Sequence, residues 1–197
     1  MKKVAFTIIL SCFLFIIISC AGEYTPKPAG YARIERSNVE LRKNDFGDFS
    51  FLYPSDVYIE EAQNDQDDGV WFNLVYPEYN SVIYCTYLPI SKNKFPEKVD
   101  ENYRIVYNHA LKSESITQKV YLDSLNNAYG VVYNIKGAVA TPIQFYVSDS
   151  ISHFLRGSLY FNDEVSPDSV KQIVDIIEKD VVHLVESVRW KDNQIIE

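Results

Sequence analysis

Short apolar runs, many alternating with polar residues and separated by turn-forming residues, fill the chain beyond its first thirty positions. Runs of this length that are rich in aromatic and β-branched residues predict strands. They are 31–35, 49–52, 57–61, 70–76, 81–88, 120–122, 128–135, 141–147 and 154–161. The run 81–88 is apolar on both alternating faces, so we expect it inside a sheet. The runs 120–122 and 128–135 flank Asp123-Ser124-Leu125-Asn126-Asn127, whose turn formers predict a hairpin.

Two stretches have the apolar spacing of an amphipathic helix. In the stretch 97–111, the apolar residues Val99, Tyr103, Val106 and Ala110 follow one another at steps of four, three and four. The second begins at Ser166-Pro167-Asp168, which supplies an N-cap, a proline at the first helical position and an early carboxylate, and it ends near Arg189. Its expected inner stripe is Val170, Ile173, Val174, Ile177, Val181, Leu184, Val185 and Val188.

The order of these elements predicts an α+β fold with a mostly antiparallel sheet and two covering helices. Hairpin-length links join many of the strands, and helices at only two places argue against repeated βαβ units. With 47% hydrophobic and 23% charged residues, the composition is that of a folded domain.

The first twenty residues predict export and lipidation. Lys2 and Lys3 precede an uncharged run from Val4 to Gly22, so we expect 1–19 to be a signal peptide. Ile17-Ile18-Ser19-Cys20 has the pattern of a bacterial lipoprotein, in which the cysteine thiol receives a diacylglyceryl group and cleavage follows the small Ser19. Fatty acyl chains such as palmitate would then hold Cys20 in a membrane. The alternative is an uncleaved anchor, because the run is just long enough to span a bilayer.

Cleavage before Cys20 divides the remaining chain into a tether, 20–30, and a single domain, 31–197. Pro26 and Pro28 favour an extended tether. Without Lys2 and Lys3 the formal charge of −8 becomes −10, which argues against nucleic acid as a partner. Cys85, in a predicted strand, is expected to be a small buried hydrophobe.

Candidate catalytic chemistry is confined to one short segment. Asp149, Ser150, Ser152 and His153 include the groups of a hydrolase triad, but a triad requires these groups to converge in space, which adjacency in sequence does not provide. The plainer interpretation is a polar turn before a strand. A periplasmic hydrolase or ligand-binding domain that uses Asp149, Ser150 and His153 is the alternative function.

The other candidates favour structural roles. His109 lies near the end of the first predicted helix and His183 lies on the second, with no helical metal-site spacing and no Cys/His cluster. The acidic run 64–69 lacks the ligand spacing of a known calcium loop. We therefore expect no metal, no cofactor and no enzymatic activity.

Four residues are candidates for contact with another protein: Trp71, Asn73, Arg156 and Trp190. If Phe72 faces the core, strand alternation places Trp71 and Asn73 together on the other face. Tryptophan and arginine are enriched at the energetic centres of protein interfaces. The alternative is that both tryptophans belong to the core.

Several segments together resemble the GldD-type gliding motility lipoproteins. They are Tyr24-Thr25-Pro26-Lys27-Pro28, Gly30-Tyr31-Ala32-Arg33-Ile34, Trp71-Phe72-Asn73, Tyr76-Pro77, the run from His153 to Asn162, and Arg189-Trp190-Lys191. A basic residue is frequent in that family where Ala29 stands here. The element order also looks like that of PsbP, an α+β sandwich.

The resemblance implies a lipid-anchored, non-enzymatic envelope protein required for gliding, which acts as an assembly module among other proteins of the gliding and type IX secretion machinery. The lipid would lie in the cell membrane or the outer membrane. Ala21-Gly22-Glu23 is not the acidic run that marks surface-exported lipoproteins in these bacteria, so the domain is expected to face the periplasm.

Overall fold

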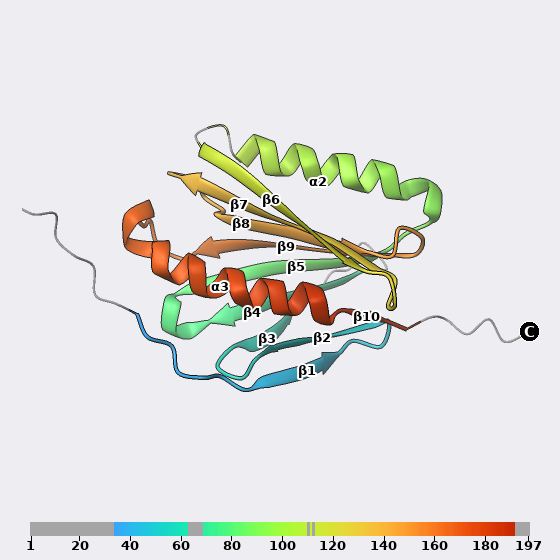
Figure 1. Cartoon of the computed structure of the whole chain (residues 1–197), viewed down its shortest axis with the longest axis horizontal. Helices are drawn as coiled ribbons and strands as arrows, with labels where there is room; N and C mark the ends of the chain where they lie inside the picture. The colour runs from blue at the N-terminus through green and yellow to red at the C-terminus, as the bar shows by residue number, and fades with distance from the viewer. Residues whose placement is uncertain (1–33, 63–68, 110, 112, 192–197) are drawn as a thin grey trace, which may run out of the picture. The chain divides into compact units, whose positions relative to one another are not determined.

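The computed structural model describes residues 34–62, 69–109, 111 and 113–191 (Figure 1). These residues form ten strands, two α-helices and two short 3-10 helices. The strands are β1 (Leu41–Asp45), β2 (Phe49–Pro54), β3 (Tyr58–Ala62), β4 (Val70–Tyr76), β5 (Ser81–Pro89), β6 (Ser113–Asp123), β7 (Ala128–Gly137), β8 (Ile143–Ser148), β9 (His153–Phe161) and β10 (Arg189–Trp190). The helices are η1 (Pro77–Tyr79), η2 (Lys92–Lys94), α2 (Phe95–His109) and α3 (Pro167–Ser187).

Two antiparallel sheets carry the fold. The large sheet has the order β3-β4-β5-β9-β8-β7-β6, and the small one has the order β1-β2-β10. Every neighbouring pair of strands runs antiparallel. The mostly antiparallel α+β fold predicted from the sequence is therefore confirmed, and β5 lies inside the large sheet, between β4 and β9.

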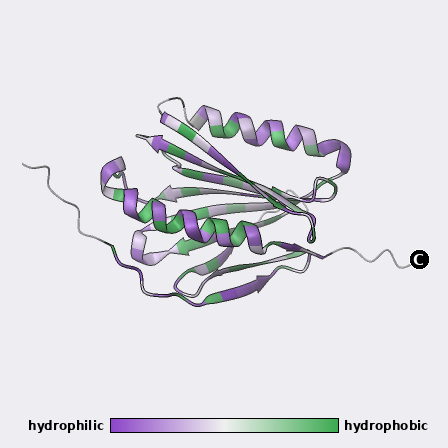
Figure 2. Ribbon diagram, in the orientation of Figure 1, coloured by the Kyte–Doolittle hydropathy of each residue, from purple (hydrophilic) through white to green (hydrophobic). Residues whose placement is uncertain are grey.

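Helix α3 and the small sheet pack against the inner face of the large sheet, while α2 lies over its outer face (Figure 1). On α3, hydrophobic residues alternate with hydrophilic ones, as Figure 2 shows. Six positions of the predicted inner stripe are buried, and Ile173 and Val174 pack against the same core while partly exposed. The predicted stripe is therefore confirmed.

One cross-strand row marks the inner face. Phe72, Cys85, Gly157 and Phe145 lie opposite one another on β4, β5, β9 and β8. A Cβ atom on Gly157 would lie 2.4 Å from the Phe145 ring, so only glycine lets the ring lie this close to β9. Cys85 is buried as predicted, and its burial raises the pKa of its thiol.

Two strands were not predicted. β1 (Leu41–Asp45) has three charged residues among five and no apolar alternation, and β10 has two residues, so only their pairing with β2 defines them. β6 begins at Ser113, seven residues before the predicted 120–122. The predicted strand at 31–35 is wrong for residues 34 and 35, which belong to no strand, and residues 31–33 lie outside the described residues.

The predicted signal peptide, Cys20 and the tether 20–30 also lie outside the described residues. Among the described helices, neither has the length and apolar character needed to cross a membrane.

Candidate functional site

The outer face of the large sheet brings three predicted contact residues together. Trp71 pairs with Thr86, Thr86 with Arg156, and Arg156 with Tyr146, so all four side chains lie on one face. Asn73 lies on the same face, two residues along β4. Tyr146 packs against the cluster around Val106 of α2, which identifies this face as the one that α2 partly covers.

Away from α2, this face exposes aromatic side chains. Trp71 is 38% exposed and Tyr84 is 50% exposed, whereas Phe72, between Trp71 and Asn73, is fully buried. Tyr58 on the edge strand β3 is also exposed, and Tyr84 meets Tyr160 edge to face at 5.6 Å between ring centroids. We call Tyr58, Trp71, Asn73, Tyr84 and Arg156 the open sheet face. Its exposed aromatic area is typical of an interaction surface.

Arg156 is the charged group of the open sheet face. It forms no ion pair or side-chain hydrogen bond with any residue that the structure describes. Burial lowers the pKa of its guanidinium, and the charge of Glu101 on α2 opposes that effect. A guanidinium in this setting has donors available for an acceptor on another molecule.

Trp190 lies apart from the other three. Its indole packs against the inner core, stacks on the His153 ring with centroids 4.9 Å apart, and donates a hydrogen bond from Nε1 to the carbonyl oxygen of Asn127 at 3.1 Å. Trp190 therefore packs between the small sheet and β9, on the opposite face of the large sheet from Trp71.

The groups of the alternative hydrolase site do not form a triad. Oδ1 of Asp149 accepts hydrogen bonds from the backbone N–H groups of Ile151, Ser152 and His153 at 2.8–2.9 Å, and Oδ2 accepts one from the Ser152 hydroxyl. The buried His153 ring is bonded through Nδ1 to the Tyr87 hydroxyl at 2.8 Å. Because the carboxylate is engaged by the turn and the imidazole by a tyrosine, this segment is a structural turn, as the plainer interpretation had it.

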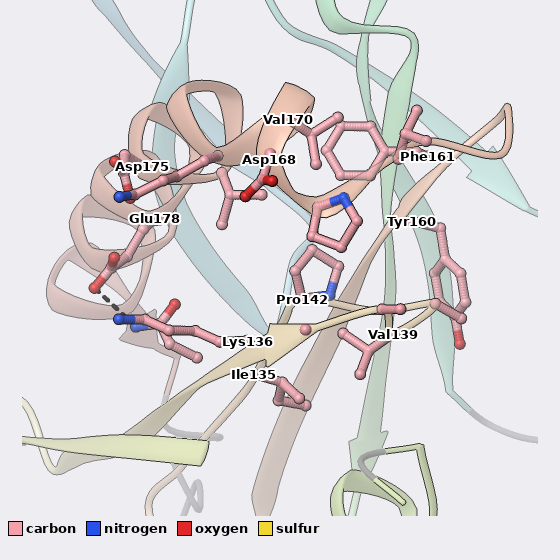
Figure 3. A pocket seen from close by; sticks show the side chains of 18 of the residues that line it. Ile135, Lys136, Val139, Pro142, Tyr160, Phe161, Asp168, Val170, Asp175 and Glu178 are labelled. Carbon is pink, nitrogen blue, oxygen red and sulfur yellow. Dashed lines mark hydrogen bonds between the residues drawn. The ribbon is translucent and has the colours of Figure 1, made fainter. Parts of the chain in front are cut away.

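A hollow of about 870 Å³ opens beside the first half of α3 (Figure 3). Its apolar lining includes Ile135, Val139, Pro142 and Val170. At its rim, Glu178 accepts hydrogen bonds from Lys119 and Asn134 at 2.7 and 2.9 Å. Acidic and basic side chains both line the hollow, so its charge favours neither an anionic nor a cationic ligand. None of the predicted site residues lines it.

Sequence reasoning missed a partly buried ion cluster near the start of the described residues. Arg36 donates to both carboxylate oxygens of Asp56, at 2.8 and 2.5 Å, and to Asp180 on α3 at 2.5 Å. Burial raises the pKa of Asp180, with Arg36 opposing that effect. Arg36 and Asp180 are 144 positions apart, and no local pattern indicates such a pair.

No grouping of three potential metal-ligating side chains occurs within the described ranges. The acidic run 64–69, considered for calcium, lies outside them except for Gly69. His183 is exposed on α3.

Comparison with protein families gives the affiliation. The model of the gliding motility lipoprotein GldD matches residues 21–190. The chain belongs to this family. The match includes the open sheet face, the turn at Asp149 and Trp190. Membership in the GldD family implies a lipoprotein with a role in gliding motility, and this is not a known enzyme family.

Other comparisons add little to this. A search of curated proteins finds no match. Among solved structures, the chain is similar to the solution structure of cyanobacterial PsbP (CyanoP) from Synechocystis sp. PCC 6803, at 11% identity and a TM-score of 0.47, over 84% of this chain and 100% of that one.

Proposed function

We propose that this GldD-family chain is a non-enzymatic assembly module, held in the membrane by lipid on Cys20 and facing the periplasm, that binds another envelope protein through the open sheet face. The partner belongs to the gliding and type IX secretion machinery. The lipid lies in the cell membrane or the outer membrane.

One observation carries this proposal: an exposed tryptophan and an exposed tyrosine share a sheet face with a guanidinium that forms no ion pair or side-chain hydrogen bond within the described residues. Exposed aromatics contribute large contact area with few torsions to restrict, and arginine offers several donors in a fixed geometry. The turn at Asp149 offers no comparable chemistry, because its polar groups are already engaged.

Trp71 and Phe72 provide a matched pair for the test. Trp71→Ala is expected to lower the free energy of unfolding by about 1–2 kcal/mol, because the indole is 38% exposed, and to abolish gliding and the cross-link to a partner in cells. Phe72→Ala, one residue away on the inner face, is expected to cost about 3–5 kcal/mol. The measurements are a thermal melt of each purified protein, colony spreading, and capture after in-cell cross-linking.

Arg156→Lys serves as a second test, because it keeps the charge and removes the planar fork of donors. We expect it to weaken partner capture without lowering the melting temperature. A Trp71→Ala protein that keeps both gliding and the cross-linked partner would contradict the proposal.

A further inference from the structure

Each sheet ends in a short, exposed edge strand, and the two strands carry opposite charges. Among the described residues, β1 (Leu41–Asp45) is one edge strand of the small sheet, whose other edge is β10, and β3 (Tyr58–Ala62) is one edge strand of the large sheet, whose other edge is β6. Both have five residues. β1 presents Arg42 and Lys43, whereas β3 presents Glu60 and Glu61, and all four side chains are exposed.

These four charges are available for a partner. None of them forms an ion pair or a side-chain hydrogen bond in the described part of the chain. The neighbouring Asp45, by contrast, is already paired with Lys191 at 2.9 Å and caps the N–H of Gly47. Charged residues on an edge strand usually prevent pairing with another edge. Like charges on β1 and β3 would prevent these two strands from pairing, whereas opposite charges do not.

The residues of the two strands also match in register. When β1 and β3 are laid antiparallel over their full length, Leu41 falls opposite Ala62 and Asp45 opposite Tyr58. The same alignment places Arg42 opposite Glu61 and Lys43 opposite Glu60. Opposite charges that face each other across an antiparallel pair stabilise it, and like charges destabilise it. Pairing β1 with another β1, or β3 with another β3, would bring like charges together.

We propose that β1 of one molecule pairs antiparallel with β3 of a second copy, in the register that joins Arg42 to Glu61 and Lys43 to Glu60. The contact uses a different surface on each copy, so it is heterologous, and it repeats from copy to copy unless the rotation closes a ring. It leaves Trp71 and Arg156 on the sheet face available. The self-association shares only Tyr58 with the open sheet face, and it does not depend on the partner proposed above.

Charge reversal tests the pairing in the full-length lipidated chain in detergent micelles, by sedimentation velocity over a range of protein concentrations. Self-association is expected to weaken at least tenfold in R42E/K43E and in E60K/E61K. In a mixture of these two variants, β1 of each variant is complementary to β3 of the other, and in the variant with all four changes every β1–β3 pair is complementary, so both are expected to regain association. The control K136E/K171E makes the same change in net charge as R42E/K43E, at exposed lysines elsewhere, and should associate like the unchanged chain.

Cysteine cross-linking tests the register in cells. Directly opposite residues of an antiparallel pair lie within disulfide reach. Co-expressed, differently tagged K43C and E60C chains are expected to form a mixed dimer, and neither variant alone is expected to form one. Native Cys85 is buried and does not compete.

Three outcomes would overturn the proposal: a chain that is monomeric at all concentrations, association that the charge reversals leave unchanged, or K43C chains that cross-link to one another. None of these outcomes bears on Trp71, so the partner proposal and the self-association proposal fail separately.

Discussion

At the scale of single residues, the turn before β9 depends on one carboxylate. Asp149 accepts three backbone N–H groups and one hydroxyl, and these bonds lower its pKa although burial alone would raise it. The turn also holds Ser150 at φ 65° and positions His153 under Trp190. A residue that resembles a catalytic acid in the sequence is therefore the cap of a turn.

This arrangement predicts a pH-dependent loss of stability. Asp149→Asn is expected to cost about 1–2 kcal/mol at pH 7, a modest figure because the turn is partly exposed to solvent. Since the folded pKa of Asp149 is lowered, its stabilising effect is present above the unfolded value of about 3.9 and is lost as pH falls through the folded value. Urea unfolding of the unchanged chain and of Asp149→Asn, at pH 7 and at pH 3, measures the difference in their free energies of unfolding. A difference that is the same at both pH values would contradict the assignment.

At the scale of elements, α3 is held mainly by its apolar stripe. Leu184 is buried at 2% exposure beside the exposed His183. Leu184→Ala is expected to cost about 2–5 kcal/mol, because it leaves a cavity in the core, whereas His183→Ala should cost less than about 1 kcal/mol. Chemical denaturation of the two variants gives the order, and a reversed order would mean that the helix is rotated about its axis.

Elements with a clear hydrophobic period were predictable. The run 70–76 coincides with β4, and the stripe from Val170 to Val188 faces the core. The alternation at Trp71 and Phe72 also gave the orientation of the open sheet face. β1 and β10 were not predictable, because their pairing with β2 and not their own composition makes them strands. The same holds for Arg36 and Asp180, which only the folded chain brings together.

At the scale of the whole molecule, the family affiliation and the sequence Ile17-Ile18-Ser19-Cys20 predict a lipid anchor. Cys20→Ser is expected to abolish labelling with a fatty-acid analogue and to leave an unprocessed precursor. Cys12→Ser, in the same apolar run, is the control and should be labelled and cleaved normally. A Cys20→Ser protein that is labelled and runs at the mature size would contradict the prediction.

The pairing of β10 with β2 has a consequence for the order of folding. Arg189 and Trp190 bond to the strand that begins at Phe49, across almost the whole domain. A chain made from its N-terminus must therefore hold β2 with one edge unpaired until Arg189 and Trp190 have been made, and contacts between residues so distant in sequence form slowly. The fully buried Phe49 has its final neighbours only then. Completion of the small sheet therefore waits for β10, and a chain cut short before Arg189 lacks the strand that completes it.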